Sequence, residues 1–283
     1  MHFMTMPRIV VAETLDHLDT HNPDAIQSRR DLQLVHRVMG TRKIILGMLC
    51  KLILKRNNKE LEKPRNSNGC GEVKALRILE LGAGDGTLML SVAAALKNIA
   101  TANIQQNEKH PLIDLTLLDQ QALVKPTTIA DYAALGWAAT STIMDVLDWA
   151  KPNTNIRLEP YLSPRWDLIM VNLFLHHFEG AQLAMLLSSI ESRADRFFAC
   201  EPSRGWFALA GSHLIGALGV NAVTREDAVL SVRAGFRDTE ITALWPAQAQ
   251  WNLREYSAGL FSHCFKGERR HLHHHGEFNA NQL

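Results

Sequence analysis

The residues with the clearest chemical potential form one short segment, from Glu80 to Thr87. An acidic residue is followed by three glycines within five positions, Gly82, Gly84 and Gly86. Glycine has no Cβ, so such a segment tolerates positive φ angles and lets a ligand approach the backbone. The apolar run before it predicts a strand. The pattern after it predicts a helix whose free N–H groups face the same ligand. The segment therefore predicts a binding loop of the nucleotide type.

The spacing of these glycines separates two kinds of ligand. The dinucleotide fingerprint G-x-G-x-x-G needs a glycine where Thr87 stands, and Glu80 would repel a pyrophosphate. The segment instead resembles the first motif, E/D-x-G-x-G-x-G, of class I S-adenosylmethionine (SAM) methyltransferases. SAM carries an amino group and a sulfonium. The resemblance implies that Glu80, Gly82 and Gly84 position its methionine moiety, with Ala83 also a cofactor-binding residue. An ordinary turn of another α/β protein is the alternative.

Asp119 ends the next predicted strand, 112–119. In nucleoside-binding α/β folds an acidic residue at the end of the second strand accepts hydrogen bonds from the ribose hydroxyls. Asp119 is therefore the ribose candidate, and Gln120 and Gln121 could share the contact. The alternative is an aspartate that only forms the turn.

Asp145 and Val146 follow a predicted short strand that runs into 144–146. The methyltransferase family has an acidic and then an apolar residue at the corresponding place. The resemblance implies that Asp145 binds the adenine amino group and that the Val146 N–H reaches a ring nitrogen. Asp148 is predicted to cap the start of a helix, because aspartate is among the preferred N-cap residues.

A wholly apolar strand within 166–178 ends in Asn172, Leu173 and then paired histidines. Such a strand is buried on both faces, and ligands bind at the carboxyl ends of such strands. The segment resembles the family's fourth motif, which implies that Asn172 and Leu173 lie beside the methyl donor. Histidine is the usual general base near neutral pH, so His176 or His177 could take a proton from an acceptor hydroxyl. The alternative is that the pair forms a structural turn. The sequence does not choose between His176 and His177 as the base.

Two later features are weaker candidates for the acceptor site. Glu201 ends the predicted strand 194–202, and its alternatives are a pair with Arg204 or a helix cap. The small, apolar stretch 203–219 is predicted to wall the acceptor pocket, and His213 within it is expected to be a core or pocket histidine rather than a base.

The remaining pattern predicts helices over 127–135 and 180–193 and a sixth strand over 236–245. A helix is also expected to begin with Thr224 as its N-cap and to end at Gly235. The last strand is predicted over 259–266. The resemblance implies an α/β, Rossmann-like fold with a seven-stranded, mostly parallel sheet, an antiparallel last strand and an N-terminal helical cap.

Composition shifts divide the chain into four parts. They are an N-terminal helical cap (1–60), a linker (61–72), a core part that the resemblance implies is a SAM-dependent methyltransferase domain (73–266), and a polar, histidine-rich tail (267–283). The cap contains an apolar helix with basic ends, 42–56. Packing on the core is favoured for it over contact with an acidic membrane surface.

The bulk composition excludes several classes of function. The 283 residues are 46% hydrophobic and carry a net charge of +1, without the basic excess of a nucleic-acid-binding protein. Four cysteines without a C-x-x-C pair are typical of reduced thiols in a cytoplasmic protein. No signal peptide or membrane span is expected. The histidine-rich tail could bind metal, but no metal site is assigned.

The sequence thus predicts a cytoplasmic SAM-dependent methyltransferase that acts on a small, apolar or phenolic acceptor. The alternatives are a non-catalytic SAM-binding partner subunit and an NAD(P)-binding oxidoreductase. Asn172-Leu173-Phe174-Leu175 replaces the Asn/Asp-Pro-Pro-Tyr/Phe motif of base methylation. The stretches 28–40 and 221–236 resemble a bacterial subgroup linked to polyketide and phenolic-lipid pathways. The acceptor atom and the oligomeric state are left open.

Overall fold

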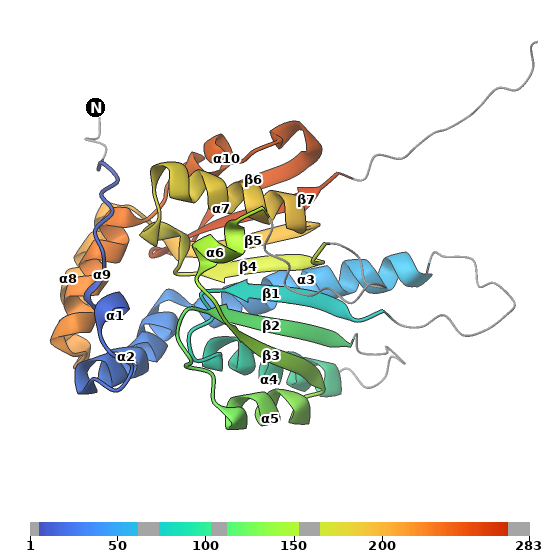
Figure 1. Ribbon diagram of the computed structural model, residues 1–283, viewed down its shortest axis with the longest axis horizontal. Coiled ribbons are helices and arrows are strands. Elements are labelled where there is room, and N and C mark those ends of the chain that lie inside the picture. Colours follow the sequence, from blue (N-terminus) through green and yellow to red (C-terminus); the bar gives the residue numbers. More distant parts are fainter. Residues whose placement is uncertain (1–5, 62–73, 103–111, 153–164, 271–283) are drawn as a thin grey trace, which may run out of the picture.

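A seven-stranded sheet organises the computed structural model, which describes residues 6–61, 74–102, 112–152 and 165–270 (Figure 1). The strand order is β3-β2-β1-β4-β5-β7-β6, and β7 is antiparallel to both of its neighbours while the other six strands are parallel to one another. The strands are β1 (Leu76–Leu81), β2 (Ile113–Asp119), β3 (Trp137–Ile143), β4 (Leu168–Asn172), β5 (Arg196–Pro202), β6 (Trp251–Ala258) and β7 (Ser262–Arg269). The predicted α/β fold with an antiparallel last strand is confirmed.

Helices cover both faces of this sheet because alternate residues of each central strand point to opposite sides. Leu79 and Leu81 of β1 enter one core cluster, and Leu76 and Ile78 enter the other. The first cluster is covered by α6 (Val146–Ala150), α7 (Gly180–Arg193) and α10 (Glu240–Leu244). The second is covered by α3 (Thr41–Leu61), α4 (Thr87–Ala102) and α5 (Pro126–Ala134). The sheet is thus the middle layer of three.

Helix α3 contributes its apolar residues to this core. Ile45, Leu49 and Leu52 recur at helical spacing, are buried and belong to the same cluster as the sheet. The packing of 42–56 on the core is therefore what the structure shows. No helix in the described part of the chain is long and apolar enough to cross a membrane. The linker lies almost wholly at 62–73, outside the described residues, and the domain division remains a prediction.

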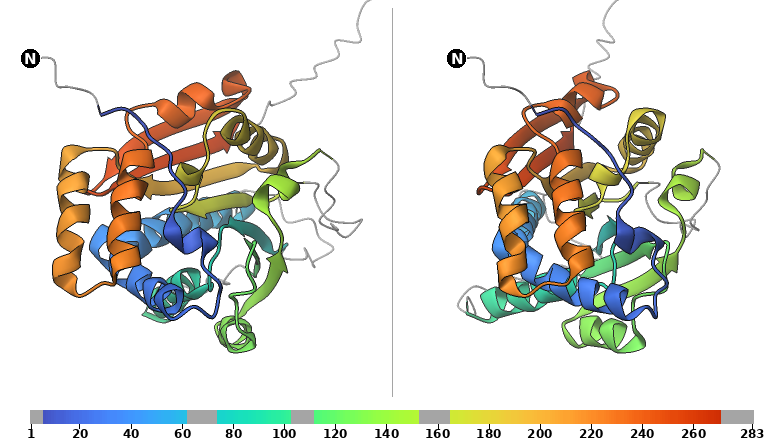
Figure 2. Two further views of the ribbon diagram at one scale, coloured as in Figure 1. Left: turned by 60° about the vertical axis from the view of Figure 1, so that its left-hand side comes forward. Right: turned by 90° about the vertical axis from the view of Figure 1, so that its left-hand side faces the viewer.

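Four helices lie beyond the end of the sheet to which the arrow of β1 points (Figures 1 and 2). They are α1 (Thr14–His17), α2 (Pro23–Met39), α8 (Trp206–Leu214) and α9 (Ala222–Ala234). Polar contacts join the first pair to α9. Asp227 accepts hydrogen bonds from the N–H groups of Thr14 and Leu15 at 2.9 and 3.0 Å, and Ser28 bonds to Thr224 at 2.8 Å. The N-terminal segment is thereby held at the carboxyl edge of the sheet.

The sixth strand lies later in the chain than predicted. The stretch 236–245 contains α10 instead, because its buried residues Ile241 and Trp245 are four positions apart and face one core. The sixth strand is β6, which forms a hairpin with β7 across a turn at Gly259 (φ 75°). The last strand accordingly begins at Ser262, three residues later than expected.

Two helix starts also differ from their predicted caps. Asp145, rather than Asp148, caps α6, since its carboxylate accepts a hydrogen bond from the N–H two residues later at 2.6 Å. Asn221, rather than Thr224, caps α9 through its side-chain oxygen, which accepts from the Thr224 N–H at 2.9 Å. In both cases the chain enters the helix earlier than the apolar pattern indicates.

Gly235 ends α9 as predicted, and its backbone is not left-handed. Its φ is −60°, which any residue can adopt. A Cβ at this position would lie 2.3 Å from the carbonyl oxygen of Pro202 at the end of β5. The glycine therefore permits close contact between the end of α9 and the sheet.

Candidate functional site

The glycine loop connects β1 to α4 in the predicted way. Gly82, Gly84 and Gly86 have φ values of 69°, 58° and 73°, all in the left-handed region that favours glycine. A Cβ at Gly84 would meet nothing within 4 Å, whereas a Cβ at Gly82 would lie 2.3 Å from the ring of Phe174. The loop therefore packs against Phe174 on one side and exposes its backbone to open space at Gly84.

Asp119 fastens this loop to the end of β2. Its two oxygens accept hydrogen bonds from the N–H groups of Gly84 and Gln121, each at 2.9 Å. Burial raises the pKa of Asp119, and these two donors partly oppose that shift. Gln120 is exposed beside it, while the Gln121 side chain accepts from Arg29 of α2 at 3.0 Å. Asp119 lies at the end of β2, where the sequence predicts ribose binding, and its ribose role stays a prediction.

Two buried acceptor atoms lie at the ends of the neighbouring strands β1 and β4. Glu80 Oε2 and Asn172 Oδ1 have no hydrogen-bond partner among the described residues, and the two residues are only 3% and 9% exposed. The register pairs Glu80 with Met170, so Glu80 and Asn172 project from the same face of the sheet. Burial, followed by the charges of Asp119 and Asp85, raises the pKa of Glu80 to about 8. Leaving such atoms unpaired is costly, so this place favours a ligand with hydrogen-bond donors or a positive charge.

The connection between α2 and α3 adds two buried groups that the sequence did not mark. His36 Nδ1 and Thr41 Oγ1 likewise have no partner among the described residues, and Thr41 is fully buried. Burial lowers the pKa of His36 to about 4, against an opposing effect of Asp85 in the glycine loop. His36 is therefore neutral at pH 7 and lies near that loop. The only signal in the sequence is the helix stop at Gly40 between them.

The adenine candidates, Asp145 and Val146, follow β3, and a small hollow that neither of them lines lies at the end of that strand. Asp119, Gln121 and the stretch 141–143 line this hollow together with Leu117 and 122–124. Val146, the first residue of α6, is buried, whereas Asp145 is exposed and uses one carboxylate oxygen as the helix cap. The structure thus places Asp145 and Val146 at the same carboxyl edge of the sheet as Asp119, and their contact with adenine stays a prediction.

The turn after β4 is fixed by Glu201, which is fully buried at the end of β5. Its carboxylate accepts hydrogen bonds from the N–H groups of Phe174 and Leu175 at 3.1 and 3.0 Å. Arg204, one of the alternative partners considered for Glu201, is instead paired with Glu240. Glu201 therefore anchors a turn rather than pairing with Arg204 or capping a helix.

Leu173 starts this turn with a φ of 49°, a value that strains a non-glycine residue. Its N–H donates to the carbonyl of Cys200 at 2.9 Å, which holds the residue in place. Strained residues of this kind concentrate at functional sites. Leu173 and Asn172 lie at the carboxyl end of β4, and their contact with the methyl donor stays a prediction.

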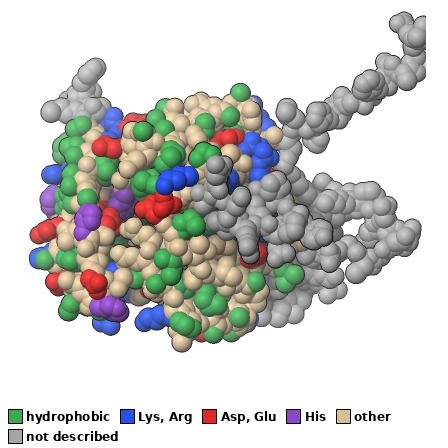
Figure 3. Space-filling model, viewed as in Figure 1, with side chains coloured by type: hydrophobic (Ala, Val, Ile, Leu, Met, Phe, Trp, Pro, Cys, Tyr) green, Lys and Arg blue, Asp and Glu red, His purple; other side chains and the backbone are tan. Residues whose placement is uncertain are grey.

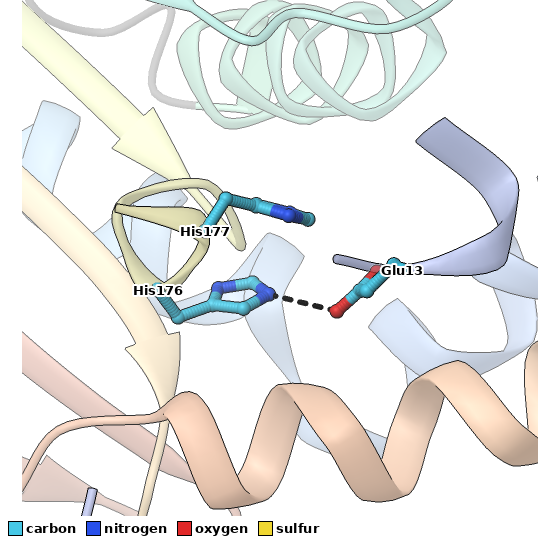
Figure 4. A group of neighbouring side chains, drawn as sticks. All are labelled: Glu13, His176 and His177. Atoms are coloured by element: carbon cyan, nitrogen blue, oxygen red, sulfur yellow. Dashed lines mark hydrogen bonds and ion pairs between the residues drawn. The ribbon is translucent and has the colours of Figure 1, made fainter. Parts of the chain in front are cut away.

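His176 is buried in the turn η1 (Leu175–His177) between the carboxylates of Glu13 and Glu201, of which Figure 4 shows that of Glu13. Its Nδ1 lies 2.8 Å from Glu201 Oε2, and its Nε2 lies 3.2 Å from Glu13 Oε1. Desolvation alone would lower the pKa of His176, but the hydrogen bonds to Glu13 and Glu201 outweigh it and raise the pKa to about 9. The protonated ring has no lone pair with which to accept a proton.

His177 is more accessible than its neighbour. Its side chain is 18% exposed, its Nδ1 lies 3.1 Å from Asp16 Oδ2 of α1, and its ring centroid lies 4.3 Å from that of His176. Of the two histidines that the sequence left open, this arrangement favours His177 as a proton acceptor. His213 lies elsewhere, exposed on α8 rather than in the core or a pocket.

Comparison with known proteins finds similar folds only among solved structures. No family model and no curated protein matches the chain. An O-methyltransferase family protein from Burkholderia thailandensis is 14% identical, with a TM-score of 0.44 over 81% of this chain and 59% of its own. Magnesium protoporphyrin IX methyltransferase from Synechocystis PCC 6803, solved with bound SAM, is 13% identical, with a TM-score of 0.45 over 91% of this chain and 88% of its own. The pyocyanin biosynthetic protein PhzM is 14% identical, with a TM-score of 0.42 over 71% of this chain and 52% of its own.

The strand order identifies the fold without reference to these solved structures. Three parallel strands lie on one side of β4, and β5 and the β6–β7 hairpin lie on the other. The chain has a Rossmann-like fold with an antiparallel last strand. Within this fold the glycine loop, Asp119, Asn172 and the histidine turn all lie at the carboxyl ends of parallel strands, where open α/β sheets bind their ligands.

Proposed function

We propose that the chain is a SAM-dependent methyltransferase that acts on a small, apolar or phenolic acceptor. The observation that carries this proposal is a pair of buried acceptors, Glu80 Oε2 and Asn172 Oδ1, which no described residue bonds and which lie beside the open backbone of Gly84. An ammonium group satisfies both oxygens, and its positive charge favours the ionised form of Glu80.

The other unpartnered groups suit the rest of a methionine moiety. An α-amino acid presents a carboxylate as well as an ammonium, and the carboxylate requires donors. The Thr41 hydroxyl and the neutral His36 ring can each supply one N–H or O–H donor. We infer that the α2–α3 connection binds the methionine carboxylate while Glu80 and Asn172 bind its amino group.

The remaining parts of SAM follow the predicted assignments. A carboxylate offers about four acceptor positions, and the backbone N–H groups of Gly84 and Gln121 occupy two of those on Asp119. The others are available for ribose hydroxyls. The hollow beside Asp119 supports an adenine site at the end of β3, although Asp145 and Val146 do not line it.

The start of α4 argues against a dinucleotide in this place. A pyrophosphate would bind the free N–H groups at the helix N-terminus. Here Asp85 accepts from the Thr87 N–H at 3.0 Å and from the Thr87 hydroxyl at 2.6 Å. A negative group thus already occupies the position that a pyrophosphate needs. The surface in Figure 3 also mixes acidic and basic side chains on the face shown, which does not suggest a nucleic-acid substrate.

Catalysis would consist chiefly of alignment. Bound SAM supplies a methyl group that its sulfonium already activates. The chain's residues hold donor and acceptor in line, and positioning of this kind lowers a barrier by about 7–11 kcal/mol. If the acceptor is a hydroxyl, His177 would take its proton at Nε2, because Asp16 engages Nδ1.

Titration calorimetry with SAM and with NADH separates the candidate functions. We expect SAM to bind in a 1:1 ratio and NADH to give no heat. Binding of NADH alone would overturn the proposal in favour of an oxidoreductase. Mass spectrometry of extracts incubated with methyl-labelled SAM then identifies the acceptor. SAM binding without label transfer to any fraction would instead indicate the non-catalytic partner subunit.

A further inference from the structure

Glu13, His176 and His177 form a cluster of potential metal ligands that two distant segments bring together (Figure 4). One nitrogen of each histidine and one oxygen of Glu13 all lie within 4.8 Å of one another. Both imidazole rings extend from the turn after β4 toward the carboxylate of the N-terminal segment. We propose that these three side chains bind a divalent transition-metal ion of the zinc type.

The distances and the ligand types agree with this assignment. Zinc binds imidazole nitrogen and carboxylate oxygen at about 2.0–2.2 Å in a tetrahedral arrangement, so neighbouring ligand atoms lie about 3.3–3.5 Å apart. His176 Nε2 and Glu13 Oε1 are separated by 3.2 Å. Two histidines with one carboxylate also leave a coordination position open, which is typical of sites that bind a further molecule.

Each proposed ligand is oriented by a second side chain. Glu201 contacts Nδ1 of His176 at 2.8 Å, and Asp16 contacts Nδ1 of His177 at 3.1 Å, so each ring directs Nε2 to the ion. The Ser231 hydroxyl donates to Glu13 Oε1. Carboxylates that fix the second nitrogen of a histidine are the usual outer shell of protein metal sites.

Charge balance also favours a divalent cation. Three carboxylates, of Glu13, Asp16 and Glu201, contact the two imidazoles. The guanidinium of Arg8 compensates in part, since it donates to the carbonyl oxygens of His176 and Phe178 at 3.3 and 2.9 Å. A proton shared between His176 and Glu13 bonds to only these two side chains, whereas a divalent ion would bind all three ligands.

The ion would act at the acceptor side of the proposed active site. Phe174, two residues before His176, packs against Gly82 of the glycine loop, which places the cluster near that loop. An ion there would coordinate an oxygen of the acceptor and lower the pKa of a bound hydroxyl. Because coordination uses the same nitrogen of His177 that would accept a proton, the metal-bound form has no need of His177 as a base.

The test is zinc titration without SAM, so its outcome does not depend on the proposed methyl transfer. The histidine-rich tail would compete for zinc, so all variants carry alanine at the four tail positions His271, His273, His274 and His275. After treatment with EDTA and dialysis, calorimetry should show one zinc per chain with a Kd in the micromolar range or below. His177→Ala and Glu13→Gln should each weaken binding at least tenfold. His21→Ala, which removes an exposed histidine of the same N-terminal segment, should change nothing.

Two results would overturn the inference. One is loss of all zinc binding on substitution of the tail alone. The other is unchanged affinity in both His177→Ala and Glu13→Gln. Circular dichroism and thermal melting of each variant establish that it is folded. The isosteric Glu13→Gln keeps the test decisive if His177→Ala is destabilised.

Discussion

Protonation of Glu80 should control SAM affinity. With a pKa of about 8 in the free protein, Glu80 is mostly neutral at pH 7. A bound ammonium favours the carboxylate, so binding releases a proton and becomes weaker as the pH falls below 8. The ionised fraction drops roughly fivefold between pH 8 and 7 and roughly tenfold between pH 7 and 6. Each tenfold step corresponds to about 1.4 kcal/mol of binding free energy.

The assay is calorimetric titration of SAM at several pH values, in buffers that differ in their enthalpy of ionisation. At pH 7 the free protein should release close to one proton on binding SAM. The amino group of SAM itself titrates near pH 8, so the informative quantity is the difference between the native chain and Glu80→Gln. The variant should bind SAM more weakly at pH 8 and should lose most of the slope between pH 6 and 7.5.

An unchanged slope in Glu80→Gln would refute this reasoning, because another group would then be responsible. Asn172→Ala supplies a matched control, since it removes the other unpartnered buried acceptor without removing a titratable group. It should weaken binding at every pH and leave the slope intact. Parallel loss of slope in both variants would show that the pH effect comes from a disturbed loop rather than from ionisation of Glu80.

Three further predictions follow from the same geometry. Because the pKa of Glu80 is raised in the folded chain, the unfolded chain binds fewer protons than the folded chain between about pH 4.5 and 8. The free energy of unfolding without SAM should therefore fall as the pH rises through this window, by up to about 1.4 kcal/mol per pH unit. Urea melts should show a flatter pH profile in Glu80→Gln. Asp119→Ala should raise the SAM Kd by one to two orders of magnitude, from the loss of about 1.5–3 kcal/mol of charged hydrogen bonding; unchanged calorimetric affinity would remove Asp119 from the ribose role. His177→Ala should lower kcat while SAM affinity is retained, and Asp16→Asn should lower kcat less; normal turnover of both across pH would leave alignment alone as the mechanism.

Local features of the chain predicted the elements that rely on local chemistry. The three glycines predicted a left-handed loop, because few other residues adopt positive φ in succession. Asp119 and Asn172 were recognisable because each follows an apolar run that could only be a buried strand. These features are encoded within a few residues, so they can be read without knowledge of the partner elements.

The errors arose where two local patterns competed. The stretch 236–245 is apolar enough for a strand, yet Ile241 and Trp245 are spaced for one face of a helix. The caps of α6 and α9 depended on whether Asp145 or Asn221 could reach an N–H two or three residues later. That choice is made by how the chain leaves the preceding element, which periodicity does not report.

Contacts across the carboxyl edge were not accessible to sequence reasoning. Glu13 meets His176 from 163 positions away, and Asp16, His36 and Thr41 reach the same edge only because α1 and α2 pack against α9 and α3. No short motif contains these pairs. A carboxylate in an N-terminal segment looks like a solvated charge until the fold places it against a buried ring.

The paired histidines have different polar contacts although they are adjacent residues of the same type. In η1 both rings extend toward the N-terminal segment, but His176 lies between Glu201 and Glu13, whereas Nδ1 of His177 contacts Asp16 of α1. The first is held at both nitrogens, and the second is held only at Nδ1. Without a metal ion, therefore, a fixed imidazolium at His176 lies beside a ring whose Nε2 is not engaged by Asp16. The N-terminal segment supplies a carboxylate to each ring, so detaching that segment would release both histidines at once. We infer that the segment 13–16 is part of the proposed active site, since its carboxylates contact both histidines.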